Sequence, residues 1–209
     1  MNKYITETIG TFFLVLTIGL CVTSGTEWAP LAIGSVLMVM VYMGGHISGA
    51  HYNPAVSLAV LMRGKISGGE AVKYMLFQLI GAVLAALVTW WLAEETFVPA
   101  RGIGVGQAQA LAAEAIFTFA LALVVLQTAF NDVTSGNSYY GLAIGFTLFV
   151  GVQAVGGISG GAINPAVGLG PIIVGAIAGT SGFGDAILYL VGPFAGGALA
   201  AVAFKRQAG

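Results

Sequence analysis

The segment GGHISGAHYNPAV, residues 44–56, nearly recurs as VGGISGGAINPAV at residues 155–167. Each copy joins a glycine-rich run to Asn-Pro-Ala-Val, and each lies within apolar sequence. Proline lacks an N–H and suits the first turn of a helix, and asparagine is a preferred N-cap. The two copies therefore predict that one helix starts at Asn53 and another at Asn164, each preceded by extended backbone.

Both predicted helices, about 54–62 and about 165–175, are too short to cross a bilayer. A helix rises about 1.5 Å per residue, whereas the hydrocarbon core is about 30 Å thick. Non-helical backbone at membrane depth persists only where it packs in protein or lines a wet cavity. A single Asn-Pro could be a mere N-cap after a turn, but two matched copies disfavour that alternative. We expect the amides of Asn53 and Asn164 to be donors at the centre of a water path. We expect backbone carbonyls along this path at Gly49, Ala50, His51, Gly160, Gly161, Ala162 and Ile163.

The composition indicates an integral membrane protein. Of the 209 residues, 58% are hydrophobic and 7% are charged, whereas about 25% are charged in soluble domains. A chain with seven Lys and Arg residues and a net charge of −1 cannot build a basic face, which excludes a nucleic-acid partner. Cys21 is single, and we find no metal-ligand cluster, nucleophile–base pair or cofactor motif. We therefore expect no metal, no cofactor and no enzymatic activity.

Six apolar runs are long enough to span the membrane, and their flanking charges predict the orientation. If the N-terminus is cytoplasmic, Arg101 alone among the basic residues falls outside. We therefore expect both termini in the cytoplasm, and the cell (inner) membrane as the location if the protein is prokaryotic. The predicted spans are 4–24, 31–50, 71–93, 109–130, 139–157 and 184–204.

The chain is an internal duplication with three spans in each half. TETIGTFFLVL (6–16) pairs with AEAIFTFALAL (113–123), and their offset nearly equals that between the two Asn-Pro motifs. Because three is an odd number, the second copy enters the membrane from the opposite side, as in inverted-repeat transporters. We therefore predict one all-α channel domain over residues 1–209, built from repeats 1–105 and 106–209.

Two half-helices that enter from opposite faces place both of their N-termini near the middle of the bilayer. The positive ends of their dipoles oppose a cation or a proton there, whereas a neutral molecule meets no such barrier. The pattern therefore predicts a narrow passive pore for small, neutral, hydrogen-bonding solutes.

Taken together, these features resemble the aquaporin (major intrinsic protein) family. The paired Asn-Pro-Ala motifs, the GHISGAHYNPAV loop, the repeated Glu7 and Glu114 and the six spans carry the resemblance over essentially the whole chain. It implies a right-handed bundle of six transmembrane helices plus two re-entrant half-helices, usually a homotetramer with one pore per subunit. It also implies that Asn53 and Asn164 are the central pore donors, and that Glu7 and Glu114 accept hydrogen bonds from the re-entrant loops and hold them.

The second motif departs from the family pattern at its fourth residue. Most water and glycerol channels of the family continue Asn-Pro-Ala-Arg, and that Arg forms the selectivity filter, whereas position 167 here is Val. The resemblance implies three further filter positions, and carrying them over by their distance from the motifs gives Ile33, Val152 and Gly161. This ring is apolar and uncharged, and we expect it to be wider than a water-only filter because the guanidinium fork is lost. It resembles some plant vacuolar-membrane (tonoplast) channels, which pass water, urea, ammonia, hydrogen peroxide and sometimes glycerol.

The leading prediction is a passive channel in the lipid bilayer for water and small neutral solutes, with urea, glycerol, ammonia and hydrogen peroxide as candidates. One alternative is a water-selective channel, and another is an apolar ring that hinders water by dewetting. A remoter alternative is a proton-coupled transporter that uses Glu7 and Glu114. A gating role of His46 or His51 also stays open, because histidine titrates near neutral pH.

Overall fold

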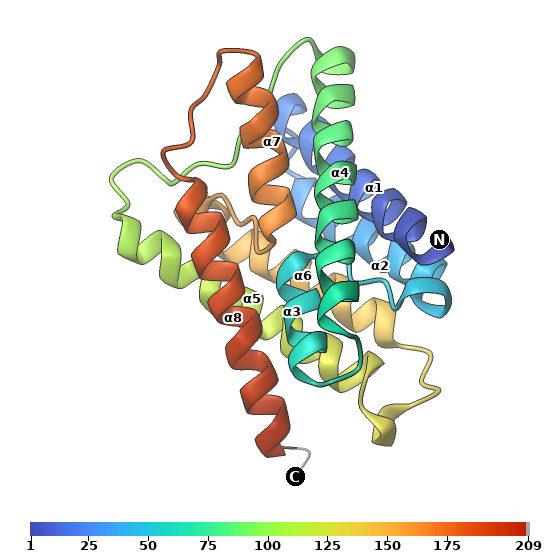
Figure 1. Cartoon of the computed structure of the whole chain (residues 1–209). Helices are drawn as coiled ribbons and strands as arrows, with labels where there is room; N and C mark the ends of the chain where they lie inside the picture. Colours follow the sequence, from blue (N-terminus) through green and yellow to red (C-terminus); the bar gives the residue numbers. More distant parts are fainter. Residues whose placement is uncertain (208–209) are drawn as a thin grey trace.

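The computed structural model describes residues 1–207, which form helices and loops without a β-strand (Figure 1). Six helices are long: α1 (Asn2–Ser24), α2 (Ala29–Ser48), α4 (Gly68–Ala93), α5 (Gln107–Ala129), α6 (Tyr140–Ser159) and α8 (Ala186–Gln207). Three are short: α3 (Pro54–Met62), the 3₁₀ turn η1 (Asp132–Thr134) and α7 (Pro165–Ile177).

Each of the six long helices is long and apolar enough to cross a membrane. Large apolar side chains such as Leu76, Trp91 and Leu199 are exposed on their outer faces. Such exposure suits a protein surrounded by hydrocarbon, because the helices satisfy their own backbone hydrogen bonds. The predicted fold class, an all-α membrane protein with six spanning helices and two further short ones, is confirmed.

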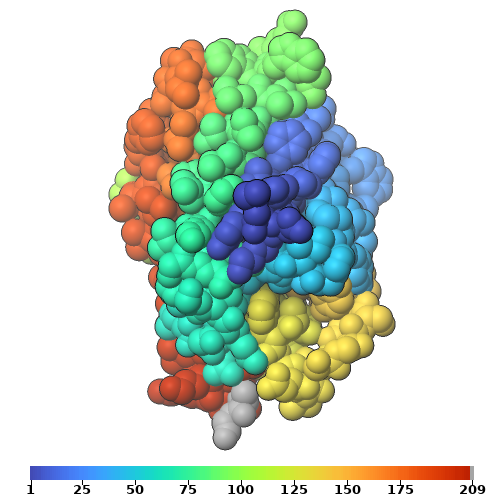
Figure 2. All heavy atoms as spheres, turned by 45° about the vertical axis from the view of Figure 1, so that its right-hand side comes forward, coloured from blue at the N-terminus to red at the C-terminus, as the bar shows by residue number. Residues whose placement is uncertain are grey.

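The long helices pack in close pairs, α1 with α4, α5 with α8, and α2 with α6. Figure 2 shows the start of α1, in dark blue, between α4 in green and α2 in lighter blue. A Cβ placed on Gly192 of α8 would lie 2.8 Å from the Cβ of Glu114 on α5. A Cβ on Gly81 of α4 would lie 3.2 Å from the backbone nitrogen of Phe12 on α1. Small residues permit this close approach of membrane helices.

The two short helices begin where the sequence predicts. α3 starts at Pro54 and α7 at Pro165, and the preceding asparagine is extended in both cases, with φ of −153° and −163°. The side-chain oxygen of each asparagine accepts a hydrogen bond at 2.9 Å from the backbone N–H two residues later. Both asparagines are therefore N-caps of their helices.

The far ends of the short helices differ from each other. α3 ends at Met62, as predicted, whereas α7 continues to Ile177, beyond the predicted end at 175. Pro171 lies inside α7 and removes one backbone donor without ending the helix. α7 is buried along most of its length, so tertiary packing sustains a helix that the proline alone would weaken.

Candidate pore

The N-termini of α3 and α7 meet through a reciprocal pair of hydrogen bonds. Asn53 Nδ2 donates to the Ile163 carbonyl at 2.9 Å, and Asn164 Nδ2 donates to the Tyr52 carbonyl at 2.9 Å. Each amide thus caps its own helix with its oxygen and bonds the opposite loop with its nitrogen. An amide NH₂ group carries two hydrogens, and the second one has no acceptor among the described residues. Each asparagine therefore keeps one donor free.

The loops before the two short helices have an unusual backbone. Three non-glycine residues lie in the left-handed region, with φ of 50° at Ala50, 48° at Tyr52 and 53° at Ile163. Gly160 and Gly161 have φ of 84° and 62°. A left-handed non-glycine residue costs of order 1–3 kcal/mol and persists only where surrounding structure over-determines it. Strong local hydrogen bonds must therefore hold both loops.

In the first loop the carboxylate of Glu7, fully buried on α1, provides these bonds. Glu7 accepts hydrogen bonds from the His51 N–H at 3.0 Å and the Tyr52 N–H at 2.7 Å. It also accepts from Ser48 Oγ at 2.6 Å and Gln78 Nε2 at 2.8 Å. Four charge-assisted hydrogen bonds offset the cost of burying one carboxylate.

In the second loop Glu114 on α5 occupies the matching position and is also fully buried. It accepts from the Ala162 N–H at 3.0 Å, the Ile163 N–H at 2.6 Å and Ser159 Oγ at 2.7 Å. Glu114 therefore makes three of the bonds that Glu7 makes and lacks a counterpart of the bond from Gln78. The glutamate of each loop therefore has the same set of donors except for this one.

Tyrosines, which the sequence analysis did not single out, close each loop from the other side. Tyr74 donates its hydroxyl to the Ser48 carbonyl at 2.8 Å, and Tyr189 donates to the Ser159 carbonyl at 2.8 Å. The repeated Ile-Ser-Gly triplets place both serines in matched positions. The tyrosines also lie at matched positions of a repeated segment, AVKYMLFQLIGAVLAAL (71–87) and AILYLVGPFAGGALAAV (186–202), which is the signal that could have found them.

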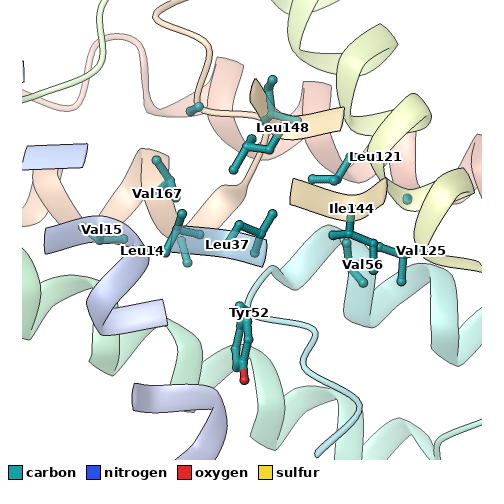
Figure 3. Close-up of a cluster of buried hydrophobic side chains, with 14 of the residues drawn as sticks. Leu14, Val15, Leu37, Tyr52, Val56, Leu121, Val125, Ile144, Leu148 and Val167 are labelled. Carbon is teal, nitrogen blue, oxygen red and sulfur yellow. The ribbon is translucent and has the colours of Figure 1, made fainter. Parts of the chain in front are cut away.

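A cavity of about 350 Å³ runs alongside the two asparagines. All four predicted filter residues line it, although they come from distant parts of the sequence. Figure 3 shows aliphatic side chains of α1, α2, α5, α6 and α7 around a common space, with Val167 among them and the Tyr52 ring pointing away. The lining filter residues are Ile33, Val152, Gly161 and Val167.

The lining contains no Asp, Glu, Lys or Arg side chain among the described residues. Its polar side chains are Asn53, Asn164 and His51. His51 is held by a 3.0 Å contact from its Nδ1 to Ser57 Oγ and packs against the rings of Tyr74 and Phe130. The cavity is therefore an apolar passage with hydrogen-bonding groups concentrated at the two loops.

The residues predicted to supply pore carbonyls fall into two groups. Ala50, His51, Gly160, Gly161 and Ala162 line the cavity, whereas Gly49 and Ile163 do not. The Ile163 carbonyl instead accepts the bond from Asn53, and the Tyr52 carbonyl, which the sequence analysis did not consider, is its counterpart. Glu7 and Glu114 lie behind the loops and do not line the cavity.

The sequence matches the model of the family described as major intrinsic protein over residues 1–204. The chain belongs to this family. A relative from Lactiplantibacillus plantarum named glycerol uptake facilitator protein-like 6 is 35% identical, and the match covers 96% of this chain and 95% of the relative. Aquaporin NIP1-4 of Oryza sativa subsp. japonica is 34% identical, with coverage of 98% and 76%.

The X-ray structure of the aquaglyceroporin from Plasmodium falciparum shares the fold. Its TM-score is 0.85 at 23% identity, and the match covers 98% of this chain and 95% of that one. Members of the major intrinsic protein family are passive membrane channels for water or small solutes and are not enzymes. The predicted family is confirmed, and the protein is a multi-pass integral membrane channel of this class.

Proposed function

We propose that the channel conducts water together with small neutral solutes, with urea, glycerol, ammonia and hydrogen peroxide as candidates. The observation that carries this proposal is the uncharged, aliphatic lining of the cavity at Val167, where most family members have an arginine. An arginine there would occupy the passage with a long side chain and a rigid fork of donors. A valine leaves that volume to the solute, and it takes away a positive charge at the narrowest point.

In this proposal Asn53 and Asn164 are the central donors, because each keeps one N–H without a protein partner. The carbonyls that line the cavity accept hydrogen bonds from the solute on either side of this centre. Glu7 and Glu114 hold the two loops rather than contact the solute. Their burial behind the loops and their full sets of hydrogen bonds support this role.

We further propose that the channel excludes protons and other ions. The N-termini of α3 and α7 meet at the two asparagines, so the positive ends of two helix dipoles act on the same region. A second observation disfavours proton-coupled transport, because no carboxylate lines the cavity among the described residues. Solute flux is therefore expected to stay unchanged when the pH and sodium gradients are collapsed.

The proposed assembly is a homotetramer with one pore per subunit and both termini in the cytoplasm. The α3–α4 loop, η1 and the end of α8 lie at one end of the molecule in Figure 2. This end carries most of the basic residues, which agrees with the preference of Lys and Arg for the cytoplasmic side. A cell (inner) membrane location would follow for a prokaryotic protein.

Val167→Arg tests the proposed filter. We expect urea and glycerol permeability of proteoliposomes to fall about tenfold or more, which corresponds to about 1.4 kcal/mol of added barrier. Water permeability is expected to fall less, because water is the smallest permeant. Stopped-flow light scattering under solute gradients measures both quantities.

Val167→Ile is the matched control because it keeps the ring apolar, and it should preserve glycerol flux. Undiminished glycerol permeation through Val167→Arg would show that residue 167 is not at the constriction.

A further inference from the structure

The segment Phe97–Ala100, here called the strap, has no regular secondary structure, lies between α4 and α5 and lines the cavity with all four of its residues. The sequence analysis did not single out this segment. In Figure 1 it belongs to the α4–α5 loop, on the same side of the bundle as the α7–α8 loop. The pore wall on this side is therefore a loop and not a helix.

Contacts on both sides fix the strap in place. Before it, Thr96 Oγ1 lies 2.6 Å from Thr180 Oγ1, beyond the end of α7. After it, Arg101 Nε donates to both oxygens of Asp185, at 3.0 and 3.2 Å. The Gly102 N–H donates to the Ile158 carbonyl at 3.0 Å. The strap is thus tied to α6 and to the α7–α8 loop.

The side chain of Phe97 anchors the start of the strap inside the bundle. Phe97 is 7% exposed. A Cβ on Gly19 of α1 would lie 2.5 Å from both Phe97 Cε1 and Thr89 Oγ1, so the ring fills the space that this glycine leaves between α1 and α4. At the other end of the strap Ala100 is exposed. A substitution at Ala100 therefore changes the passage without removing a buried contact.

The backbone of the strap is unpaired. No N–H or C=O group of residues 97–100 has a protein hydrogen-bond partner within the described part of the chain. Unpaired backbone groups are costly unless water or a solute satisfies them. A Cβ on Gly160 would lie 3.0 Å from both the nitrogen and the oxygen of Ala100, so these groups are adjacent to the filter position Gly161. The charges of Arg101 and Asp185 neutralise each other, so this ion pair adds no net charge at the mouth.

We propose that the strap is a second selectivity element of this channel, which limits solute size and supplies hydrogen-bonding groups beside the apolar filter. This inference rests on the proposed function, because it requires that solutes larger than water enter the pore. In a channel with arginine at the filter, the side chain would provide the polar contact. In this chain the strap backbone lines the same cavity as Val167 and offers polar groups that no protein group occupies.

Asp185→Ala tests the inference by releasing one tie of the strap without altering any cavity-lining residue. We expect the ratio of glycerol to water permeability in proteoliposomes to rise roughly threefold or more, because the passage widens. Glu70→Ala is the matched control, since it removes the ion pair of Glu70 with Lys3, which joins α1 to α4 away from the strap. The control should keep the ratio of the unmodified protein.

Ala100→Phe tests the same inference in the opposite direction. It remains informative if Asp185→Ala does not fold. The added ring should lower glycerol permeability at least roughly threefold relative to water. The inference is overturned if Ala100→Phe leaves the ratio unchanged, or if folded Asp185→Ala does so. Failure of the proposed function is a separate result, namely that the unmodified protein passes neither glycerol nor urea.

Discussion

Glu7→Ala is expected to abolish the folded channel. The substitution leaves four donors without their acceptor, and two of them are backbone N–H groups of a loop that contains left-handed residues. A buried donor without a partner costs about 1–3 kcal/mol, so four of them would remove much of the roughly 5–15 kcal/mol by which proteins are stable. Size-exclusion chromatography in detergent and water permeability of proteoliposomes measure this loss.

Two variants serve as controls for this result. Glu27→Ala removes an exposed carboxylate from the loop between α1 and α2 and should leave both readouts unchanged. Glu7→Gln keeps one acceptor oxygen and should give an intermediate loss of stability. If Glu7→Ala elutes and conducts water like the unmodified protein, Glu7 does not hold the loop.

Replacement of either pore asparagine by alanine is expected to lower both stability and water flux. Asn53→Ala removes the N-cap of α3, worth about 0.5–2 kcal/mol, and leaves the buried Ile163 carbonyl without its donor. Asn164→Ala does the same for α7 and Tyr52. The lost donors also weaken hydrogen bonding to permeating water, and we expect its permeability to fall about tenfold, equal to about 1.4 kcal/mol of barrier. Thermal unfolding in detergent and stopped-flow swelling measure the two effects.

Asn131→Ala is the matched control for the pore asparagines. Asn131 also caps a helical turn, with its side-chain oxygen accepting from the Val133 N–H at 3.0 Å, but it precedes η1 and does not line the cavity. This control should leave water flux intact. Because the two crossing bonds hold the same pair of loops, the double variant of Asn53 and Asn164 should deviate from additivity. Additive effects together with normal water flux would contradict the proposed pore centre.

The sequence predicts the helical frame well because the frame depends on local properties. Hydropathy and length identify the six spans, and the two Asn-Pro pairs identify the starts of α3 and α7. These signals come from residues next to one another in the chain. The predicted end of α7 was less accurate, because the packing of this helix overrides the effect of Pro171.

The contacts between distant residues could be predicted only in part. The family resemblance implied that the repeated glutamates each hold a loop, and the hydrogen bonds of Glu7 and Glu114 fit that role. The bond from Gln78 to Glu7 joins α4 to α1 and has no local pattern that would indicate it. The strap was missed for the same reason, because its position at the cavity depends on ties such as Arg101–Asp185.

The division into repeats 1–105 and 106–209 stays a prediction about the organisation of the chain. The hydrogen bonds of Glu7 in the first half resemble those of Glu114 in the second, and the bond from Asn53 to Ile163 resembles that from Asn164 to Tyr52, which agrees with this division. The two halves differ in detail, since Gln78 has no counterpart at Glu114. Such a difference is compatible with repeats that share a backbone arrangement but have separate side-chain partners.

The central claim is that a channel with valine at the filter passes solutes larger than water. The most direct test is a panel of solute permeabilities for the unmodified protein, measured by stopped-flow swelling of proteoliposomes under sucrose, urea and glycerol gradients. We predict that urea or glycerol flux rises above that of empty liposomes, together with water flux, whereas sucrose stays excluded. A rise in water flux alone would contradict the claim and would indicate a water-selective channel that tolerates Val167.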